Sequence, residues 1–74
     1  MLKKKGLLDA AISSFKEAIC LRPNYPEAYY NLGNALREKG DLDDAISAYT
    51  LSIKLKHSYA KAHNNLGNAL KEKG

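Results

Sequence analysis

The chain repeats itself with a period of 34 residues. When residues 1–40 are aligned with residues 35–74, 21 of the 40 positions are identical. The longest shared block, Asn-Leu-Gly-Asn-Ala-Leu, occupies residues 31–36 and again residues 65–70. This period is too long for a coiled coil and fits a helix-turn-helix unit. The repeat therefore predicts a solenoid, in which each unit buries its apolar face against its neighbours.

Apolar residues recur at helical spacing in each half of the period. Between Gly6 and Pro23 they fall at steps of three and four, and the pattern returns after Asp41. Such spacing places them on one helical face, and no segment alternates with the period of two typical of a strand. We predict four helices: one before Pro23, one over residues 26–39, one after Asp41 and one over residues 60–73. The predicted fold class is all-α, an α-solenoid of antiparallel helices with about two repeats.

The boundaries of these helices carry recognisable signals. Asn24, followed three residues later by Glu27, resembles a capping box, and Pro26 falls in the first turn, where its missing N–H costs nothing. We expect Gly40 to form the left-handed turn that ends the second helix. Asp41 is the predicted cap of the third helix.

Each repeat places a glycine inside a helix, at Gly33 and at Gly67. A glycine in a helix interior costs about 1 kcal/mol relative to alanine. Its recurrence predicts that the paired helix approaches closely there, with Ala45 opposite Gly33.

Charge and hydropathy narrow the function classes. The net charge is +4, from twelve Lys and Arg against eight Asp and Glu, and the only basic run is residues 3–5. Nucleic-acid-binding domains usually show a denser basic stripe, so a solvated surface is favoured. A nucleic-acid adaptor is the minor alternative, and it predicts steep salt dependence of binding. No run approaches the ~18 apolar residues of a membrane span, and no signal-peptide pattern opens the chain, so we expect a cytoplasmic protein without membrane contact.

The sequence lacks the arrangements typical of catalytic, cofactor or metal sites. His57 is expected in a turn and His63 at an aromatic core position, neither with metal-ligand spacing to the single Cys20. Cys20 lies on an apolar helical face and is predicted to be a small buried residue. The block around Gly33 has one glycine and is not a phosphate-binding loop. We expect no enzyme activity, no metal and no cofactor.

The repeated residues resemble the tetratricopeptide repeat family over essentially the whole chain. Residues 28–33 are similar to the start of that family's first helix, where a large aromatic is followed by Leu-Gly. The alanine, aromatic and small residue of its second helix are matched twice, by Ala11, Phe15 and Ala18 and by Ala45, Tyr49 and Ser52. Pro23 matches the proline that ends a unit. The chain departs from the family where Tyr29 and His63 replace its tryptophan and where His57 replaces the second proline.

The phase of the repeat predicts how the chain is organised. A single domain over residues 1–74 would contain the second-type helix that ends a repeat (1–25), one complete repeat (26–59) and the first helix of the next (60–74). Residues 1–5 align with residues 69–73, two periods later.

The resemblance implies that first-type helices line a concave groove that holds an extended peptide. The sequence marks the same face independently, because asparagine is a poor choice for a plain exposed helix position, yet it recurs at two helical sites in both copies. Each carboxamide offers two donors and an acceptor, which suits a peptide backbone. The predicted peptide-binding residues are Glu27, Tyr30, Asn31, Asn34, Arg37, Lys61, Asn64, Asn65, Asn68 and Lys71.

Other readings of the asparagines stay open: a solvated surface, or bonds between neighbouring repeats. If the asparagines bind a ligand, they resemble those of the long arrays that precede an O-linked N-acetylglucosamine transferase domain, where asparagines hold the ligand backbone. In the related clamp for chaperone tails, asparagines are combined with lysine and arginine. Asn34 and Asn65 match two of those asparagines, but Tyr30 stands where a lysine is needed. We therefore do not predict chaperone-tail binding.

A second hypothesis is a structural block that assembles with itself. Helical repeats normally need at least three units, and this chain has about two, so we expect a homo-oligomer through open repeat ends, head-to-tail or with an exchanged helix. If two chains joined in the register of the repeat, residues 1–5 of one chain would overlap residues 69–73 of the other. Residues 1–5 should therefore fray or be displaced. A third reading is the targeting array of a larger enzyme. The predicted end-to-end contacts are Ile12, Phe15, Ile19, Leu66 and Leu70.

Overall fold

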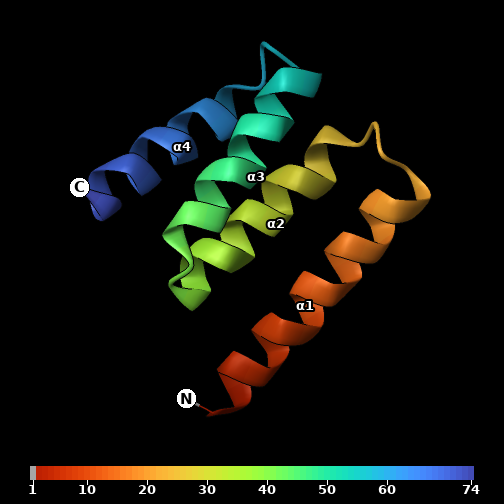
Figure 1. Ribbon diagram of the computed structural model, residues 1–74, viewed down its shortest axis with the longest axis vertical. Helices are drawn as coiled ribbons and strands as arrows, with labels where there is room; N and C mark the ends of the chain where they lie inside the picture. Colours follow the sequence, from red (N-terminus) through yellow and green to blue (C-terminus); the bar gives the residue numbers. More distant parts are fainter. Residues whose placement is uncertain (1) are drawn as a thin grey trace.

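Four helices stand side by side in the computed structural model, which describes residues 2–74 and the side chains from residue 6 onward. They are α1 (Leu2–Leu21), α2 (Pro26–Lys39), α3 (Leu42–Leu55) and α4 (Ala60–Lys73). Successive helices run in opposite directions and are joined by short turns (Figure 1). No strand occurs within residues 2–74. The predicted all-α solenoid of about two repeats is confirmed.

The helices form two unequal sides of the array. Helix α2 packs against α1 and α3 and also contacts α4, whereas the described backbones of α1 and α3 do not approach within 8 Å between Cα atoms. First-type helices α2 and α4 therefore lie closer together than second-type helices α1 and α3. A difference of this kind curves an array toward the closer helices, which places α2 and α4 on its inner side.

Two ion pairs repeat with the sequence. Lys39 Nζ lies 3.1 Å from Asp9 Oδ1, and Lys73 Nζ lies 2.6 Å from Asp43 Oδ1, with both partners shifted by 34 residues. Exposed pairs of this kind contribute little stability. Their recurrence indicates that α1 meets α2 as α3 meets α4.

The turns before α2 and α4 repeat as well. The guanidinium carbon of Arg22 lies 4.5 Å from the centre of the Tyr25 ring, and Lys56 Nζ lies 4.9 Å from the centre of the Tyr59 ring. A cation over an aromatic face is attracted by the ring quadrupole. Each turn thus ends with a tyrosine whose ring is covered by the basic residue three positions earlier.

Two predicted side-chain caps are absent from the structure. The N-cap of α2 is Tyr25, so Asn24 lies one residue too early for the predicted capping box. Asp41 is the N-cap of α3, but its carboxylate makes no capping hydrogen bond. Pro26 does occupy the first turn, and Gly40 does end α2 with a left-handed φ of 104°.

Helix α1 is longer than the periodicity predicts. Its backbone is helical from Leu2 and passes through Gly6, although the equivalent Gly40 turns. Glycine permits a positive φ without requiring it, and continuing the helix pairs backbone groups. Residues 2–5 therefore extend α1 instead of forming the end of a first-type helix. The prediction that residues 1–5 fray or are displaced when chains join stays a prediction. Met1 and the side chains of residues 2–5 lie outside the described part of the structure.

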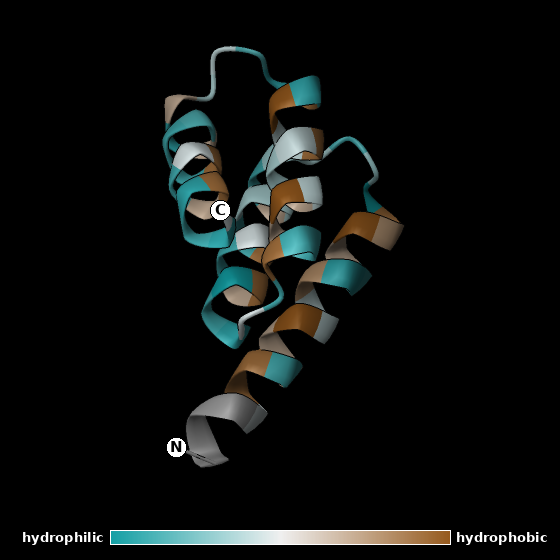
Figure 2. Cartoon of the chain, turned by 60° about the vertical axis from the view of Figure 1, so that its left-hand side comes forward, coloured by the Kyte–Doolittle hydropathy of each residue, from teal (hydrophilic) through white to brown (hydrophobic). Residues whose placement is uncertain are grey.

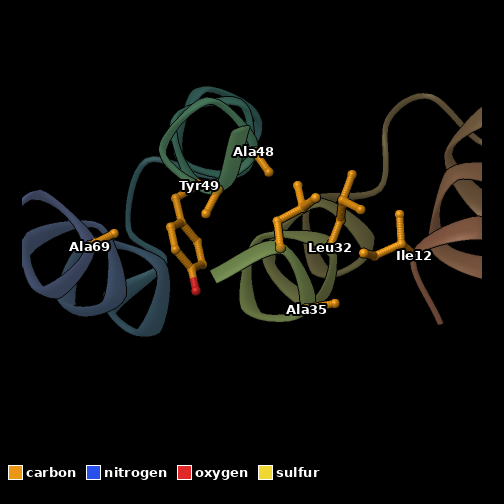
Figure 3. Close-up of a cluster of buried hydrophobic side chains, with 8 residues drawn as sticks. Ile12, Leu32, Ala35, Ala48, Tyr49 and Ala69 are labelled. Carbon is orange, nitrogen blue, oxygen red and sulfur yellow. The ribbon is translucent and has the colours of Figure 1, made fainter. Parts of the chain in front are cut away.

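The core lies between α2 and α3 and extends to α1 and α4. Apolar residues recur at helical intervals along every helix (Figure 2). Several core residues are alanines, so the helices can approach closely. The buried cluster consists of Ile12, Leu32, Ala35, Leu36, Ala45, Ala48, Tyr49 and Ala69 (Figure 3).

Tyr49 is the largest fully buried side chain, and its ring lies on Gly33. A Cβ placed on Gly33 would be 2.6 Å from Tyr49 Cε1, closer than a real side chain tolerates. The close approach predicted for Gly33 is confirmed, but the residue opposite is Tyr49 rather than Ala45. A glycine was needed because the aromatic ring fills the space that a Cβ would take.

Candidate functional site

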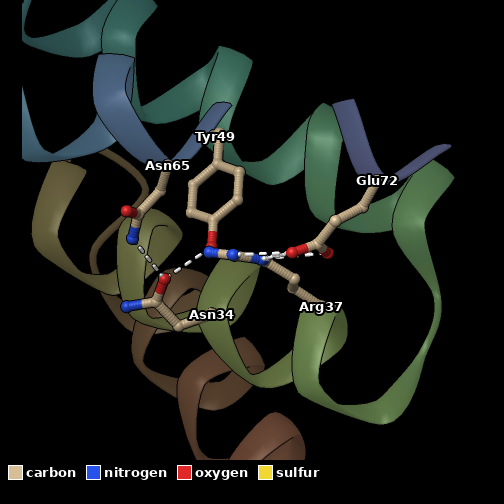
Figure 4. A network of polar contacts seen from close by, with 5 residues as sticks. All are labelled: Asn34, Arg37, Tyr49, Asn65 and Glu72. Carbon is tan, nitrogen blue, oxygen red and sulfur yellow. Dashed lines mark hydrogen bonds and ion pairs between the residues drawn. The ribbon is translucent and has the colours of Figure 1, made fainter. Parts of the chain in front are cut away.

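The centre of the candidate groove is a hydrogen-bonded network across α2, α3 and α4 (Figure 4). Asn65 Nδ2 on α4 donates to Asn34 Oδ1 on α2 over 2.8 Å, and the Tyr49 hydroxyl donates to the same oxygen over 2.5 Å. Asn65 Nδ2 also donates to the Tyr30 hydroxyl over 3.2 Å. The central asparagines therefore bond between neighbouring repeats, as one alternative reading allowed.

The network fixes which way each amide points. Asn34 Oδ1 accepts from two donors, and Asn65 Nδ2 donates to two acceptors. This leaves Asn34 Nδ2 to donate and Asn65 Oδ1 to accept. Both atoms point away from Tyr49, to the same side (Figure 4). The pair thus presents one donor group and one acceptor side by side.

Tyr49 keeps its proton under ordinary conditions. Burial raises the pKa of the Tyr49 hydroxyl above its usual value of 10.0, because a phenolate inside the array would lose its hydration. The hydroxyl therefore remains a donor to Asn34 across the physiological range.

Tyr30 packs against two other tyrosines beside this network. Its ring centre lies 5.3 Å from that of Tyr59 and 6.2 Å from that of Tyr49, both tilted. Such aromatic contacts add stability beyond area burial. Burial raises the pKa of Tyr59. The sequence analysis missed Tyr59, although its identity with Tyr25 one period earlier marked both turns.

Arg37 is held by Glu72 at the other end of the network. Arg37 Nη2 lies 2.7 Å from Glu72 Oε2, and Arg37 Nε lies 3.2 Å from each carboxylate oxygen. The hydrogen bonds from Arg37 hold the pKa of Glu72 below its usual 4.5. The positive charge that we assigned to Arg37 is thus largely neutralised within the chain. A hollow of about 400 Å³ here is lined by Asn34, Arg37, Glu38 and Glu72.

The remaining predicted groove residues are exposed along α2 and α4. Asn65 faces α2 and Asn34 faces α4. By the 34-residue equivalence, Asn31 lies where it would meet a preceding first-type helix, and Asn68 where it would meet a following one. The structure therefore brings Tyr30, Asn34, Asn65 and Arg37 together around one network. It leaves these side chains open to solvent: Glu27, Asn31, Lys61, Asn64, Asn68 and Lys71.

The predicted end contacts divide into covered and uncovered residues. Ile12 is buried against the core, which removes it from the candidate contact (Figure 3). Phe15, Ile19 and Leu66 are half-buried, and Leu70 is 51% exposed.

Three sequence expectations outside the groove need correction or restatement. Cys20 is exposed, so its predicted burial is wrong. His63 is also exposed instead of filling an aromatic core position, and its Nε2 lies 2.8 Å from the His57 carbonyl oxygen. Beyond the neighbouring backbone of its own helix, Gly67 has no atom within 4 Å of a Cβ built on it, unlike Gly33. Cys20 lies off the apolar face of α1, since its equivalent Lys54 is exposed on α3 as well. His63 and Gly67 are open because no helix within residues 2–74 covers α4 as α3 covers α2.

Neither a metal cluster nor a membrane span is found in the described residues. No three His, Cys, Asp or Glu side chains there are grouped closely enough to hold a metal ion. Among residues 2–74, no helix has both the length and the apolar character to cross a membrane.

Comparison with known proteins agrees with the repeat geometry. The family model described as TPR repeat matches residues 1–37 and again residues 33–74. Together the two matches span the chain. No curated protein sequence matches it.

Proposed function

Because the chain belongs to the tetratricopeptide repeat family, whose arrays generally mediate protein–protein interaction, we propose that the inner face of α2 and α4 binds an extended segment of another polypeptide. The observation that carries this proposal is the oriented asparagine pair. Asn34 Nδ2 and Asn65 Oδ1 present a donor and an acceptor on one side. An extended peptide offers the complementary carbonyl oxygen and N–H.

The internal network supports this role by holding the amides in place before a ligand arrives. Two hydrogen bonds hold Asn34 Oδ1, and the Tyr30 ring packs on Tyr59 beside Asn65. Side chains that are already ordered lose less rotamer freedom on binding. The resemblance to arrays that precede O-linked N-acetylglucosamine transferase domains supports the same backbone-holding mode.

The outer asparagines extend the ladder beyond the central pair. Asn31 and Asn68 are exposed and occupy the same repeat positions as Asn65 and Asn34. Neither carries the structural bonds of the central pair, so both amides are available to a ligand. Tyr30 and Asn64 flank the ladder, with Glu27 and Lys61 at its amino-terminal end. These residues make up the proposed groove.

Charge selectivity would depend on an ion pair that is already made. An acidic side chain of the ligand would have to displace Glu72 from Arg37, whereas Lys71 is exposed on α4. We therefore propose that Lys71 attracts carboxylates before Arg37 does. Arg37 would contribute only to a ligand that replaces its three hydrogen bonds to Glu72.

The test uses a peptide selected from a random 12-residue library displayed on phage, then titrated by calorimetry. Asn31 and Asn68 are changed to alanine together, because Asn34→Ala would also unpair the Tyr49 hydroxyl. Two lost hydrogen bonds at about 1 kcal/mol each should weaken binding about thirtyfold. Asn24→Ala is the matched control, since Asn24 lies exposed in the connection between α1 and α2. Equal affinity of the double variant and the control would refute the ladder.

A second candidate function is self-association of the array. It is favoured by one observation: Gly67 faces open space, whereas its equivalent Gly33 is covered by an aromatic ring. The targeting array of a larger enzyme remains a prediction that the geometry does not address.

A further inference from the structure

We infer that α4 of one copy receives α1 of a second copy, with the second copy's Phe15 seated on Gly67 as Tyr49 is seated on Gly33. This assigns both surfaces and the register of a head-to-tail joint between 74-residue chains. The joint does not require a peptide in the groove.

The proposed interface already occurs once within the chain. Helices α2 and α3 form it internally, and their equivalents 34 residues away are α4 and α1. On α3 the contact face is fully buried at Ala45, Tyr49 and Ser52. On α1 the same positions are Ala11, Phe15 and Ala18, and all three are half-buried. The α1 face therefore matches a partner helix that residues 2–74 do not place against it.

Helix α4 has an uncovered surface that matches the α1 face. Leu36 on α2 is 7% exposed, whereas its equivalent Leu70 on α4 is 51% exposed. A Cβ on Gly33 would overlap the Tyr49 ring, but a Cβ on Gly67 meets nothing within 4 Å. Gly67 thus bears the helix-propensity cost of a glycine without an aromatic neighbour. Phe15 has the ring needed to fill that space.

The helical course of residues 2–5 avoids the clash that their equivalence to residues 70–73 would otherwise cause. In an unbroken array, residues 1–5 of the second copy would coincide with residues 69–73 of the first. The backbone of α1, however, runs straight from Leu2 through Gly6. In an antiparallel pair the start of α1 lies beside the end of α4, so residues 2–5 would project beyond Lys73. The straight helix makes the joint sterically open.

The joint would also lengthen the peptide groove. The second copy's Asn31 would approach Asn68 of the first, as Asn65 approaches Asn34 within one chain. Each copy therefore completes an asparagine pair of its neighbour. Because Phe15 lacks the hydroxyl of Tyr49, Asn68 would keep one acceptor position for a ligand. Contacts of this head-to-tail kind can continue through many copies.

The test exploits the open space at Gly67. Gly67→Gln adds a polar side chain where the monomer has room, but it would occupy the seat of Phe15. Phe15→Asp blocks the opposite surface, and each variant keeps one intact end. Molar mass is measured by light scattering from about 10 µM to about 1 mM, the range of weak association. We expect the wild type to grow in mass with concentration, both variants to stay monomeric, and their equimolar mixture to form a dimer and stop there.

Each contrary result is decisive. Growth of Gly67→Gln in the same way as the wild type overturns the joint, and this variant keeps the test valid even if circular dichroism shows that Phe15→Asp has unfolded. A mixture of two folded variants that stays monomeric overturns it too, as does a wild type monomeric throughout. A wild-type dimer that does not grow, and that persists in Gly67→Gln, identifies helix exchange instead. None of these readouts involves the peptide, so failure of the joint and failure of the groove are separately visible.

Discussion

Helices α2 and α3 in the middle of the chain and helices α4 and α1 at its edges share one sequence pattern in two different environments. Tyr49 is fully buried and Phe15 half-buried, although both occupy the aromatic position of a second-type helix. Gly33 is covered and Gly67 open. The comparison teaches that in a repeat the neighbouring helix, more than the residue, decides what a position contributes.

The largest effect is expected from the aromatic pair. Tyr49→Ala should destabilise the fold by about 3–5 kcal/mol, as for other buried aromatics, which is comparable to the whole stability of a domain of this size. Phe15→Ala should cost clearly less, because Phe15 is only half-buried. Urea unfolding followed by circular dichroism measures both. Equal losses would mean that the two environments are energetically alike, against the comparison.

The glycine pair should respond with opposite signs. Gly33→Ala forces a Cβ against the Tyr49 ring, an overpacking that costs about 1–3 kcal/mol and outweighs the gain in helix propensity. Gly67→Ala has only that gain and should stabilise the monomer by about 1 kcal/mol. Thermal unfolding at low protein concentration measures the difference without association. Stabilisation by both substitutions would show that the ring yields and that Gly33 is not required.

Most of the fold could be predicted from the sequence, because a 34-residue period and helical spacing are properties of neighbouring residues. The bounds of α2 followed from Pro26 and Gly40, and those of α4 from the equivalent positions one period later, Ala60 and Gly74. The length of α1 did not, since Gly6 has the same identity as Gly40, and glycine permits the left-handed turn without requiring it. The burial of Cys20 was wrong for a different reason: Cys20 lies off the apolar face of α1, and its equivalent Lys54 is exposed on α3 as well.

The candidate site was predictable in position and less so in detail. The asparagine positions followed from the repeat, but their donors and acceptors depend on how closely α2 approaches α4. The Arg37–Glu72 pair joins residues 35 apart in sequence, one period plus one, so it becomes visible only when the two copies are placed side by side. Residue spacing along one helix could not reveal it.

The Tyr49 hydroxyl separates the two aromatic positions more finely. Tyr49→Phe gives α3 the aromatic residue that α1 has at Phe15. It removes one hydrogen-bond donor to Asn34, which should lower the free energy of unfolding by about 1 kcal/mol. Because burial raises the pKa of Tyr49 in the fold, its contribution to stability is complete below pH 10 and is lost as pH rises further. The variant should therefore lose less stability above pH 10 than the wild type. Parallel alkaline profiles in urea unfolding would contradict this assignment.

The smallest effect concerns the ion pair that joins the two repeats at the exposed rim. The pKa of Glu72 is lowered in the folded chain by hydrogen bonds from Arg37, so its contribution is present above pH 4.5 and disappears as pH falls through the lower folded value. The gap in unfolding midpoint between wild type and Glu72→Gln should close below pH 4.5 and narrow in high salt, which screens exposed charges. Glu17→Gln, at an exposed glutamate on α1, is the matched control for removing one carboxylate. A Glu72→Gln profile that follows this control at every pH would mean that the pair does not couple α2 to α4 in solution. The oriented asparagines would then depend on Tyr49 and Tyr30 alone.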